Sequence, residues 1–503
     1  MKSIAQFDKK QLVQATKGTW EIDTHEQSFY VHINTDSRSV FDDSDNLQLF
    51  LAIKGDRFDG HNFIKETIEK GICAVCVSET FFNANKKYFL NMKDIKVAIL
   101  VVKDTTQAYL DIAKFYRKKL GINHNFKVIA ITGSCGKTSS KEMLKSVCEE
   151  AYGKENVYAT KANTNNHIGV PQNILNISNK CQIAILELGT SSPGEIARLA
   201  NCCRPDIALI TVIGHGHLEE LKNLEGVAEE KGDIFKFMTK KNWAIIPKLS
   251  AGHDILIKKS LTANLNQFAS NYDHDADYMG DIIEENLYGS IVTITDNSTF
   301  RSIRCQLPFQ GKHQLSNAVG VFAVAKVLGI NKEKIAKGLE RSHNVGMRMK
   351  IEQFNEKKLT IINDAYNANF DSMVASLNWL QAILRQEKFS NHSCFLVLGD
   401  MLELGGLANE LHIKIIKFLR DNFFNNEKIS AKIFLIGPQF KASLNEMNLI
   451  ANRKKIAIFD NSEEAKKVIA TELASIEQEK ILFLKGSRGM KLELIEDTVN
   501  ENS

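Results

Sequence analysis

A glycine-rich turn, TGSCGKTSS at residues 132–140, stands directly between an apolar run and a helical pattern. The run before it, VIAIT, is rich in β-branched residues and predicts a buried strand, while the apolar positions of residues 139–148 share one face of a helix. In a strand, turn and helix of this order, backbone N–H groups and the helix N-terminus surround phosphate oxygens. The turn therefore predicts an α/β domain with a parallel sheet that binds a nucleotide.

The side chains of this turn suit the phosphate tail of ATP together with magnesium. Lys137 is expected to reach the terminal phosphates, and the hydroxyl of Thr138 is expected to bind Mg²⁺. The spacing is the short GxxGKT form, because the longer phosphate-loop pattern needs glycine at position 131, where this chain has Ile131. The predicted nucleotide-binding residues of the turn are Gly133, Ser134, Cys135, Gly136, Lys137, Thr138 and Ser139.

Two further apolar runs end on residues that can bind metal ions. The run IAILELG delivers Glu187, and the run IALITVIG leads to His215 and His217. Ligands of an open parallel sheet bind outside the carboxyl ends of its strands, so these side chains should converge on the glycine turn. The sequence therefore predicts a magnesium site formed by Thr138, Glu187 and the histidines His215 and His217.

Lys231 lies on the apolar stripe of a predicted helix, in register with Val227 and Phe235, whereas Glu230 is expected to lie off that stripe. One explanation is a lysine that buries its stem and keeps its amine in water. The other is a partly buried amine with a depressed pKa that reacts with carbon dioxide, giving a carbamate whose oxygens suit magnesium. The residues alone leave both explanations open.

Apolar runs alternating with helical patterns divide the chain into three α/β units. The first, residues 1–126, contains LQLFLAI, GICAVCV and KVAILVV; the second, residues 127–343, contains the glycine turn. The third, residues 344–503, contains LTIIND, CFLVLGD, IFLIG, IAIFD and ILFLKG, a pattern typical of an open, Rossmann-like sheet. The expected fold class is thus α/β throughout.

Charge and hydropathy exclude some classes of function. Lys and Arg total 64 against 60 Asp and Glu, and this formal charge of +4 is spread along the chain, which argues against a nucleic-acid partner. The N-terminus is polar, and no apolar segment is long enough to span a bilayer. We therefore expect a cytoplasmic protein without a membrane span.

A series of motifs extends beyond the glycine turn to nearly the full chain. In this order, the motifs resemble the Mur ligase family: TDSR, KGDRFDGHNF, TGSCGKTSS, NTNNHIGVP, ELGTSSPGEI, GHGHLEEL, VAEEKGDI, GKHQLSNA, GMRM, NDAYNANFDSM, LGDMLELG and LKGSRGMKLE. The resemblance implies a small N-terminal domain for a UDP-linked precursor, a central ATPase domain with the phosphate loop, and a C-terminal Rossmann-like domain.

The fragments YNANFDSM and LGDMLELG favour the family member that adds D-alanyl-D-alanine to UDP-N-acetylmuramoyl-tripeptide in peptidoglycan precursor synthesis. The implied reaction uses ATP and Mg²⁺ and proceeds through an acyl phosphate, in a monomer. Two other functions are weighed against it. One is a sister ligase that adds a single amino acid, and the other is a nucleotide-dependent switch protein that performs no ligation.

The resemblance also implies roles for individual residues. Lys137, Glu187, His217 and a carbamylated Lys231 would form the catalytic and metal centre. Adenine and ribose would contact Asn317, Arg348, Asp364 and Asn367. The acceptor would contact Asn165, Asn166, Thr190 and Ser191 at its peptide end, and Ser37 and Arg38 with the segment 59–61 at its uridine end. The dipeptide would be positioned by Asp400, Lys485, Gly486 and Ser487.

The chain departs from the family pattern at a few positions. Val212 stands where asparagine is common, and Ala162 stands where glycine is usual. Neither departure removes a group that phosphate or metal chemistry requires, but both alter the surroundings of the site.

Overall fold

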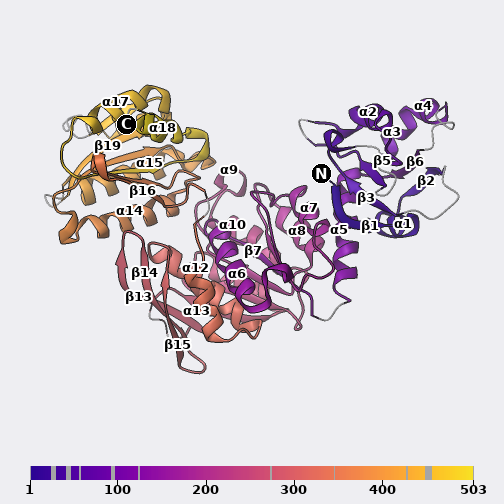
Figure 1. The fold of residues 1–503 in the computed structure, drawn as a ribbon, viewed down its shortest axis with the longest axis horizontal. Helices are drawn as coiled ribbons and strands as arrows, with labels where there is room; N and C mark the ends of the chain where they lie inside the picture. Colours follow the sequence, from indigo (N-terminus) through magenta and orange to yellow (C-terminus); the bar gives the residue numbers. More distant parts are fainter. Residues whose placement is uncertain are drawn as a thin grey trace.

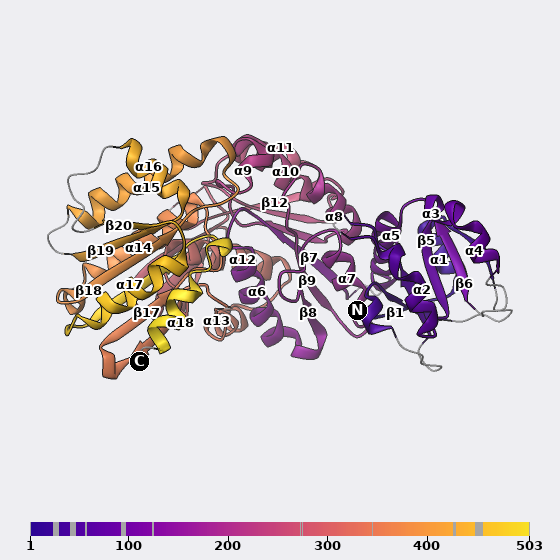
Figure 2. The same ribbon diagram turned by 90° about the horizontal axis from the view of Figure 1, so that it is seen from above.

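The protein is seen in a computed structural model that describes residues 2–23, 30–40, 47–55, 58–91, 97–122, 125–271, 273, 275–344, 346–425, 429–447 and 456–501. Its described strands form three sheets. Both ribbon views show an elongated molecule in which the first and third sheets lie at opposite ends and the second lies between them (Figure 1, Figure 2).

The N-terminal sheet has the order β1-β3-β4-β5-β6-β2, with antiparallel strands at both edges and parallel strands between them. Its strands are β1 (Lys2–Phe7), β2 (Thr19–Ile22), β3 (Val31–Asn34), β4 (Gln48–Leu51), β5 (Ala74–Ser78) and β6 (Ala98–Val102). The helices are α1 (Lys9–Thr16), α2 (Ile64–Glu69), α3 (Glu79–Ala84), α4 (Lys86–Asn91) and α5 (Thr105–Leu120). Helix α5 also packs on two helices of the central part, Gly169–Leu175 and Glu195–Cys203, so it joins the N-terminal and central parts.

The central sheet has nine described strands in the order β15-β14-β13-β12-β11-β10-β7-β9-β8. The strands are β7 (Lys127–Thr132), β8 (Val157–Ala159), β9 (Ile183–Glu187), β10 (Ile207–Ile210), β11 (Trp243–Pro247), β12 (Asn264–Ala269), β13 (Tyr278–Asn286), β14 (Gly289–Asp296) and β15 (Arg301–Leu307). The helices are α6 (Lys137–Tyr152), α7 (Gly169–Leu175), α8 (Glu195–Cys203), α9 (Leu218–Leu221), α10 (Leu224–Gly232), α11 (His253–Ser260), α12 (Lys312–Val327) and α13 (Lys332–Glu340).

The strand order places the phosphate turn at the point where the sheet changes direction. β7 pairs with β9 on one side and with β10 on the other, both in parallel. The loops after these strands therefore diverge around a crevice at the carboxyl edge, which is where ligands of open α/β sheets bind. The predicted strand, turn and helix are confirmed as β7, the loop and α6.

The central sheet is not wholly parallel, which corrects the expectation of a purely parallel sheet. β13, β14 and β15 form an antiparallel extension. Strand β14 alternates buried and partly exposed residues along most of its length, so only one face packs on the protein. Such a period of two is typical of an antiparallel sheet covered on one side, whereas β7 and β9 are buried almost throughout.

The C-terminal sheet has the order β16-β17-β21-β18-β19-β20, with only β16 antiparallel. Its strands are β16 (Lys350–Phe354), β17 (Leu359–Asn363), β18 (Ser393–Gly399), β19 (Ser430–Ile436), β20 (Ile456–Phe459) and β21 (Lys480–Lys485). The helices are α14 (Phe370–Leu384), α15 (Ala408–Leu419), α16 (Pro438–Glu446), α17 (Ser462–Ala474) and α18 (Glu493–Glu501). All five apolar runs predicted as strands here are confirmed.

The division into domains at residues 126 and 344 stays a prediction, although both positions lie between sheets. In the part of the chain that the structure describes, no helix is both long enough and apolar enough to cross a membrane.

Candidate active site

The phosphate loop begins where β7 ends at Thr132 and passes directly into α6. Gly136 caps the helix with φ 81°, a left-handed conformation that glycine adopts without strain. A Cβ at this position would overlap the side-chain amide of Asn317, and a Cβ at Gly133 would overlap the hydroxyl of Thr211. Both glycines are therefore required by the close approach of neighbouring side chains.

A cavity of about 1170 Å³ opens over this loop and is lined by both the central and the C-terminal parts of the chain. It brings together most of the predicted site residues: Ser134, Cys135, Gly136, Lys137, Thr138, Ser139, Asn165, Asn166, Glu187, Thr190, Ser191, His217, Asn317, Arg348, Asp364, Asn367 and Lys485. The predicted residues that do not line it are Ser37, Arg38, the segment 59–61, Gly133, His215, Lys231, Asp400, Gly486 and Ser487.

The hydroxyl of Thr138 stands at the centre of a polar cluster on the cavity wall. It donates to Oε2 of Glu187 at 3.0 Å and accepts from Nη2 of Arg348 at 3.2 Å. Nδ2 of Asn165 donates to the other Glu187 oxygen at 3.0 Å. The guanidinium of Arg348 also lies over the ring of Tyr366, 3.6 Å from its centroid. Strands β7 and β9 and the C-terminal part of the chain thus meet at Thr138.

Lys137 folds back onto its own loop, where its amine donates to the carbonyl of Gly133 at 2.8 Å. Burial lowers the pKa of this amine, and the nearby Glu187 carboxylate opposes that shift. A polyphosphate in the cavity would add further negative charge beside this desolvated ammonium.

His217 lines the same cavity from the loop after β10 and has φ 57°. Its Nδ1 lies 2.7 Å from Oε2 of Glu403, and the hydrogen bond from His217 lowers the pKa of Glu403. Among the described residues, no three His, Cys, Asp or Glu side chains form a group that could hold a metal ion by themselves. The donor set of Thr138, Glu187 and His217 offers hydroxyl, carboxylate and imidazole groups, which fit magnesium only if further oxygen ligands join them.

Lys231 lies beside the phosphate loop and is almost completely buried, with 1% of its surface exposed. Desolvation, aided by the charge of Lys137, lowers its pKa to about 7. The explanation of a lysine that keeps its amine in water does not fit this burial. A neutral amine is the form that adds carbon dioxide, so the surroundings suit the carbamate that the resemblance implies.

The neighbouring Glu230 contradicts the expectation that it lies off the buried stripe. It is buried, and its carboxylate accepts hydrogen bonds from the Thr190 hydroxyl at 3.0 Å and from the backbone N–H of Gly194 and Ile196 at 2.6 and 2.8 Å. The three donors satisfy a charge that would otherwise be costly to bury. Glu230 thereby fixes the loop carrying Thr190 and the start of α8, a role that helical periodicity could not reveal.

The C-terminal part contributes a buried ion pair to the cavity wall. The amine of Lys485 lies 2.5 Å from Oδ2 of Asp364, which also accepts from the Ser376 hydroxyl at 2.7 Å. Nearby, burial lowers the pKa of His313 to about 4, and its buried Nδ1 has no hydrogen-bond partner among the described residues. Sequence reasoning assigned no role to His313, although it lies in the GKHQLSNA motif.

Two residues predicted to position the dipeptide form hydrogen bonds within the C-terminal part of the chain. The carboxylate of Asp400 accepts from the backbone N–H groups of Gln439 and Phe440 at 2.8 and 2.9 Å, which caps the start of α16. The hydroxyl of Ser487 donates to the carbonyl of Ala368 at 3.2 Å. Both side chains are buried outside the cavity, so any effect on a ligand would pass through the loops they hold.

Ser37 and Arg38 lie in the N-terminal part, in a short turn away from the phosphate loop. The guanidinium of Arg38 pairs with Asp36 through two hydrogen bonds of 2.8 and 2.9 Å and is largely exposed. In the same part, Nδ1 of His61 lies 2.6 Å from Asp59. Ala162, where the family usually has glycine, adopts φ 49°. This left-handed conformation explains the usual glycine.

Comparison with known proteins identifies the family of the chain. Residues 30–117 match the Mur ligase family, catalytic domain, and residues 131–325 match the Mur ligase middle domain. The chain belongs to the Mur ligase family.

Its relatives include one particular enzyme from many bacteria. The UDP-N-acetylmuramoyl-tripeptide--D-alanyl-D-alanine ligase of Bacillus subtilis (strain 168) is 32% identical, covering 97% of this chain and 96% of the relative. The enzyme of the same name from Buchnera aphidicola subsp. Baizongia pistaciae is 35% identical, covering 93% and 92%. The crystal structure of MurF from Acinetobacter baumannii superimposes with a TM-score of 0.83 at 28% identity, over 99% of both chains.

Proposed function

We propose that this chain joins D-alanyl-D-alanine to UDP-N-acetylmuramoyl-tripeptide, with ATP as the energy source, in peptidoglycan precursor synthesis. The observation that carries the proposal is the single cavity that unites the phosphate loop, Glu187 and His217 with residues of the C-terminal part. Relatives with this activity align over almost the whole chain. The substrates are cytoplasmic metabolites, so we place the reaction in the cytoplasm. We also propose that the enzyme acts as a monomer, as the family resemblance implies.

The first step activates the acceptor, because an amide does not form from a carboxylate in water without a better leaving group. The terminal carboxylate of the tripeptide attacks the γ-phosphorus of ATP, the bond to the β–γ bridging oxygen breaks, and ADP leaves. The ammonium of Lys137 neutralises negative charge that spreads over the γ-phosphate oxygens. The product of this step is an acyl phosphate.

The second step forms the amide. The amine of D-alanyl-D-alanine attacks the acyl carbon, loses a proton, and expels inorganic phosphate. The cavity is lined from two parts of the chain, and water excluded from it cannot hydrolyse the acyl phosphate. Lys485 and Asn367 line the C-terminal side, where we place the incoming dipeptide and the ribose of ATP respectively.

Mur ligases use ATP together with Mg²⁺. We assign magnesium to Thr138, Glu187 and His217, with the carbamate of Lys231 as the additional oxygen donor. When bound, magnesium neutralises phosphate charge in such sites. Thr138 and Glu187 already lie within hydrogen-bonding distance, and the low pKa of Lys231 favours the reactive neutral amine.

The acceptor is long enough to need two separate contact regions. We place its peptide end at Asn165, Asn166, Thr190 and Ser191, which line the cavity, and its uridine end at Ser37 and Arg38 in the N-terminal part. Glu230 anchors the loop that carries Thr190. The elongated arrangement leaves the N-terminal part free to hold the nucleotide end of the acceptor.

A substrate panel tests the proposed function directly. ADP release is measured with UDP-N-acetylmuramoyl-tripeptide or UDP-N-acetylmuramoyl-dipeptide as the acceptor and with each of three amines: D-alanyl-D-alanine, diaminopimelate and lysine. We expect turnover only with D-alanyl-D-alanine. Turnover with a single amino acid on the dipeptide acceptor would identify a sister ligase, and ATP hydrolysis without any amine or acceptor would identify a switch protein.

Cys135 provides an independent test of nucleotide binding at the loop. Of the nine cysteines, eight are buried and only Cys135 is partly exposed, although desolvation raises its pKa to about 11. We expect a maleimide at mildly alkaline pH to modify Cys135 slowly, and MgATP at 100 times its Kd to slow this about 100-fold by mass action. Peptide mass spectrometry locates the adduct, and Cys135→Ser serves as the unlabelled control. Equal labelling rates with and without MgATP would show that the nucleotide does not bind at this loop.

A further inference from the structure

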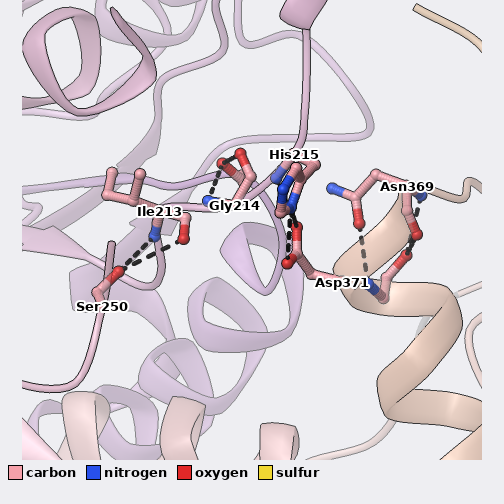
Figure 3. Close-up of polar contacts among 8 residues, drawn as sticks. Ile213, Gly214, His215, Ser250, Asn369 and Asp371 are labelled. Carbon is pink, nitrogen blue, oxygen red and sulfur yellow. Dashed lines mark hydrogen bonds and ion pairs between the residues drawn. The ribbon is translucent and has the colours of Figure 1, made fainter. Parts of the chain in front are cut away.

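The phosphate loop is tied to the loop after β10 by a reciprocal pair of hydrogen bonds. The hydroxyl of Ser134 donates to the carbonyl of Gly214 at 2.9 Å, and the N–H of Gly214 donates back to the same hydroxyl oxygen at 2.9 Å. On the other side, the N–H of Ile213 donates to Ser250 at 2.8 Å (Figure 3). The loop after β10 is therefore held by the phosphate loop at Gly214 and by Ser250 at Ile213.

The next residue, His215, continues this connection into the C-terminal part of the chain. Its backbone N–H donates to Oδ2 of Asp371 at 2.5 Å, and its Nδ1 lies 3.1 Å from each of the Asp371 oxygens (Figure 3). The ring of Phe370 packs edge-on against the His215 ring at 5.2 Å. Asp371 lies 156 residues beyond His215, so the contact joins two domains that fold around separate sheets.

Asp371 is held in place for this contact by its own helix. Asn369 caps α14 and forms a capping box with Ser372, which fixes the first turn from which Asp371 projects. A carboxylate in the first turn of a helix is also favoured by the helix dipole. The first turn of α14 therefore holds the carboxylate oxygens of Asp371 in a fixed position toward His215.

We propose that Asp371 and His215 are positioning residues that couple the placement of the C-terminal domain to the phosphate loop and to His217. The bridge is the chain of contacts from Ser134 through Gly214 and His215 to Asp371. His217 lies two residues after His215 in the same loop. This inference rests on the proposed function, because it assigns the bridge to the ligation that the cavity performs. Without the bridge, ATP still binds the loop, but the His217 segment and the C-terminal residues are no longer held in register.

The first experiment uses variants whose effects the geometry ranks. Asp371→Ala removes both the backbone and the ring contact of His215. Asp371→Asn keeps an oxygen for the backbone N–H, and His215→Ala keeps that N–H itself. For Asp371→Ala we expect kcat to fall about tenfold, within the range of measured coupling between sites, while KM for ATP changes less than about threefold. The other two variants should lose less of kcat. The double variant His215→Ala/Asp371→Ala should have a kcat no lower than that of Asp371→Ala.

A matched pair of glycine variants tests the bridge without removing either partner. A Cβ at Gly214 would overlap Oδ2 of Asp371 and displace it. The atoms nearest to a Cβ at Gly216 would belong to Asn369, at 3.5 Å, and to Ser134, at 3.7 and 3.8 Å, which are ordinary contacts. Neither glycine has a positive φ, so alanine fits the backbone at both positions. We expect Gly214→Ala to behave like Asp371→Ala, and Gly216→Ala to behave like the unaltered enzyme.

Thermal melts of every variant identify any that fail to fold, and the milder Asp371→Asn and His215→Ala variants then carry the test. Wild-type kcat in Asp371→Ala and Gly214→Ala would overturn the proposal, as would additive losses in the double variant or a loss confined to KM. The unaltered enzyme's dependence on D-alanyl-D-alanine tests the proposed function separately, because no bridge variant enters that measurement.

Discussion

Lys137→Ala should abolish ADP release while leaving the fold intact. The ammonium is the only cation of the glycine turn itself, and the phosphoryl transfer that forms the acyl phosphate develops charge beside it. Removing one such electrostatic contact costs about 3 to 4 kcal/mol of barrier, so we expect kcat to fall at least about 100-fold. A coupled ADP-release assay with both substrates measures the loss, and circular dichroism confirms the fold.

Lys145→Ala is the matched control for this substitution. Lys145 lies two turns further along α6 and pairs with Glu149 at 3.7 Å on the helix surface, outside the cavity. Its removal should leave kcat unchanged. Turnover of Lys137→Ala within tenfold of the unaltered enzyme would contradict the role of Lys137 in phosphoryl transfer.

Lys231→Met should lower kcat by a similar factor for a different reason. The substitution keeps an unbranched side chain of similar size but removes the amine that would become a carbamate. Losing a ligand that orients a catalytic metal forfeits several kcal/mol of charge stabilisation, hence a loss of at least about 100-fold. The melting temperature should not fall, because methionine has no charge to desolvate in this buried position.

The carbamate itself can be observed in protein equilibrated with ¹³C-bicarbonate. We expect a carbamate carbon signal that disappears in Lys231→Met and persists in Lys141→Met. Lys141 is a suitable control because it is also buried in the central domain, where its amine donates to the carbonyl of Thr160 at 2.9 Å. A signal that survives in Lys231→Met, or full activity of that variant, would refute the modification.

Local patterns in the sequence were sufficient for the features that depend on neighbouring residues. The β-branched run, glycine turn and apolar helix face predicted β7, the loop and α6, because strand and helix periodicities differ and the glycines mark the turn between them. The rule that ligands bind at strand ends placed Glu187 and His217 beside the turn, and the structure lines one cavity with both.

Features that depend on distant partners could not be predicted in this way. The contact of His215 with Asp371 spans 156 residues, and no periodicity links the two. Helical periodicity predicts Glu230 off the buried stripe, because its three donors lie 34 to 40 residues earlier in the chain and leave no local pattern. Long apolar runs do not reveal the antiparallel strands β13 to β15, because buried and exposed residues alternate along such strands.

The division of the cavity between two domains has a consequence for the end of each catalytic cycle. ADP and the lengthened precursor would contact walls that belong to separate lobes, so we expect the lobes to part before both products leave. A molecule that bound at the interface between the two lobes and held them together would slow the release of ADP. Such a molecule would need no likeness to ATP or to either peptide.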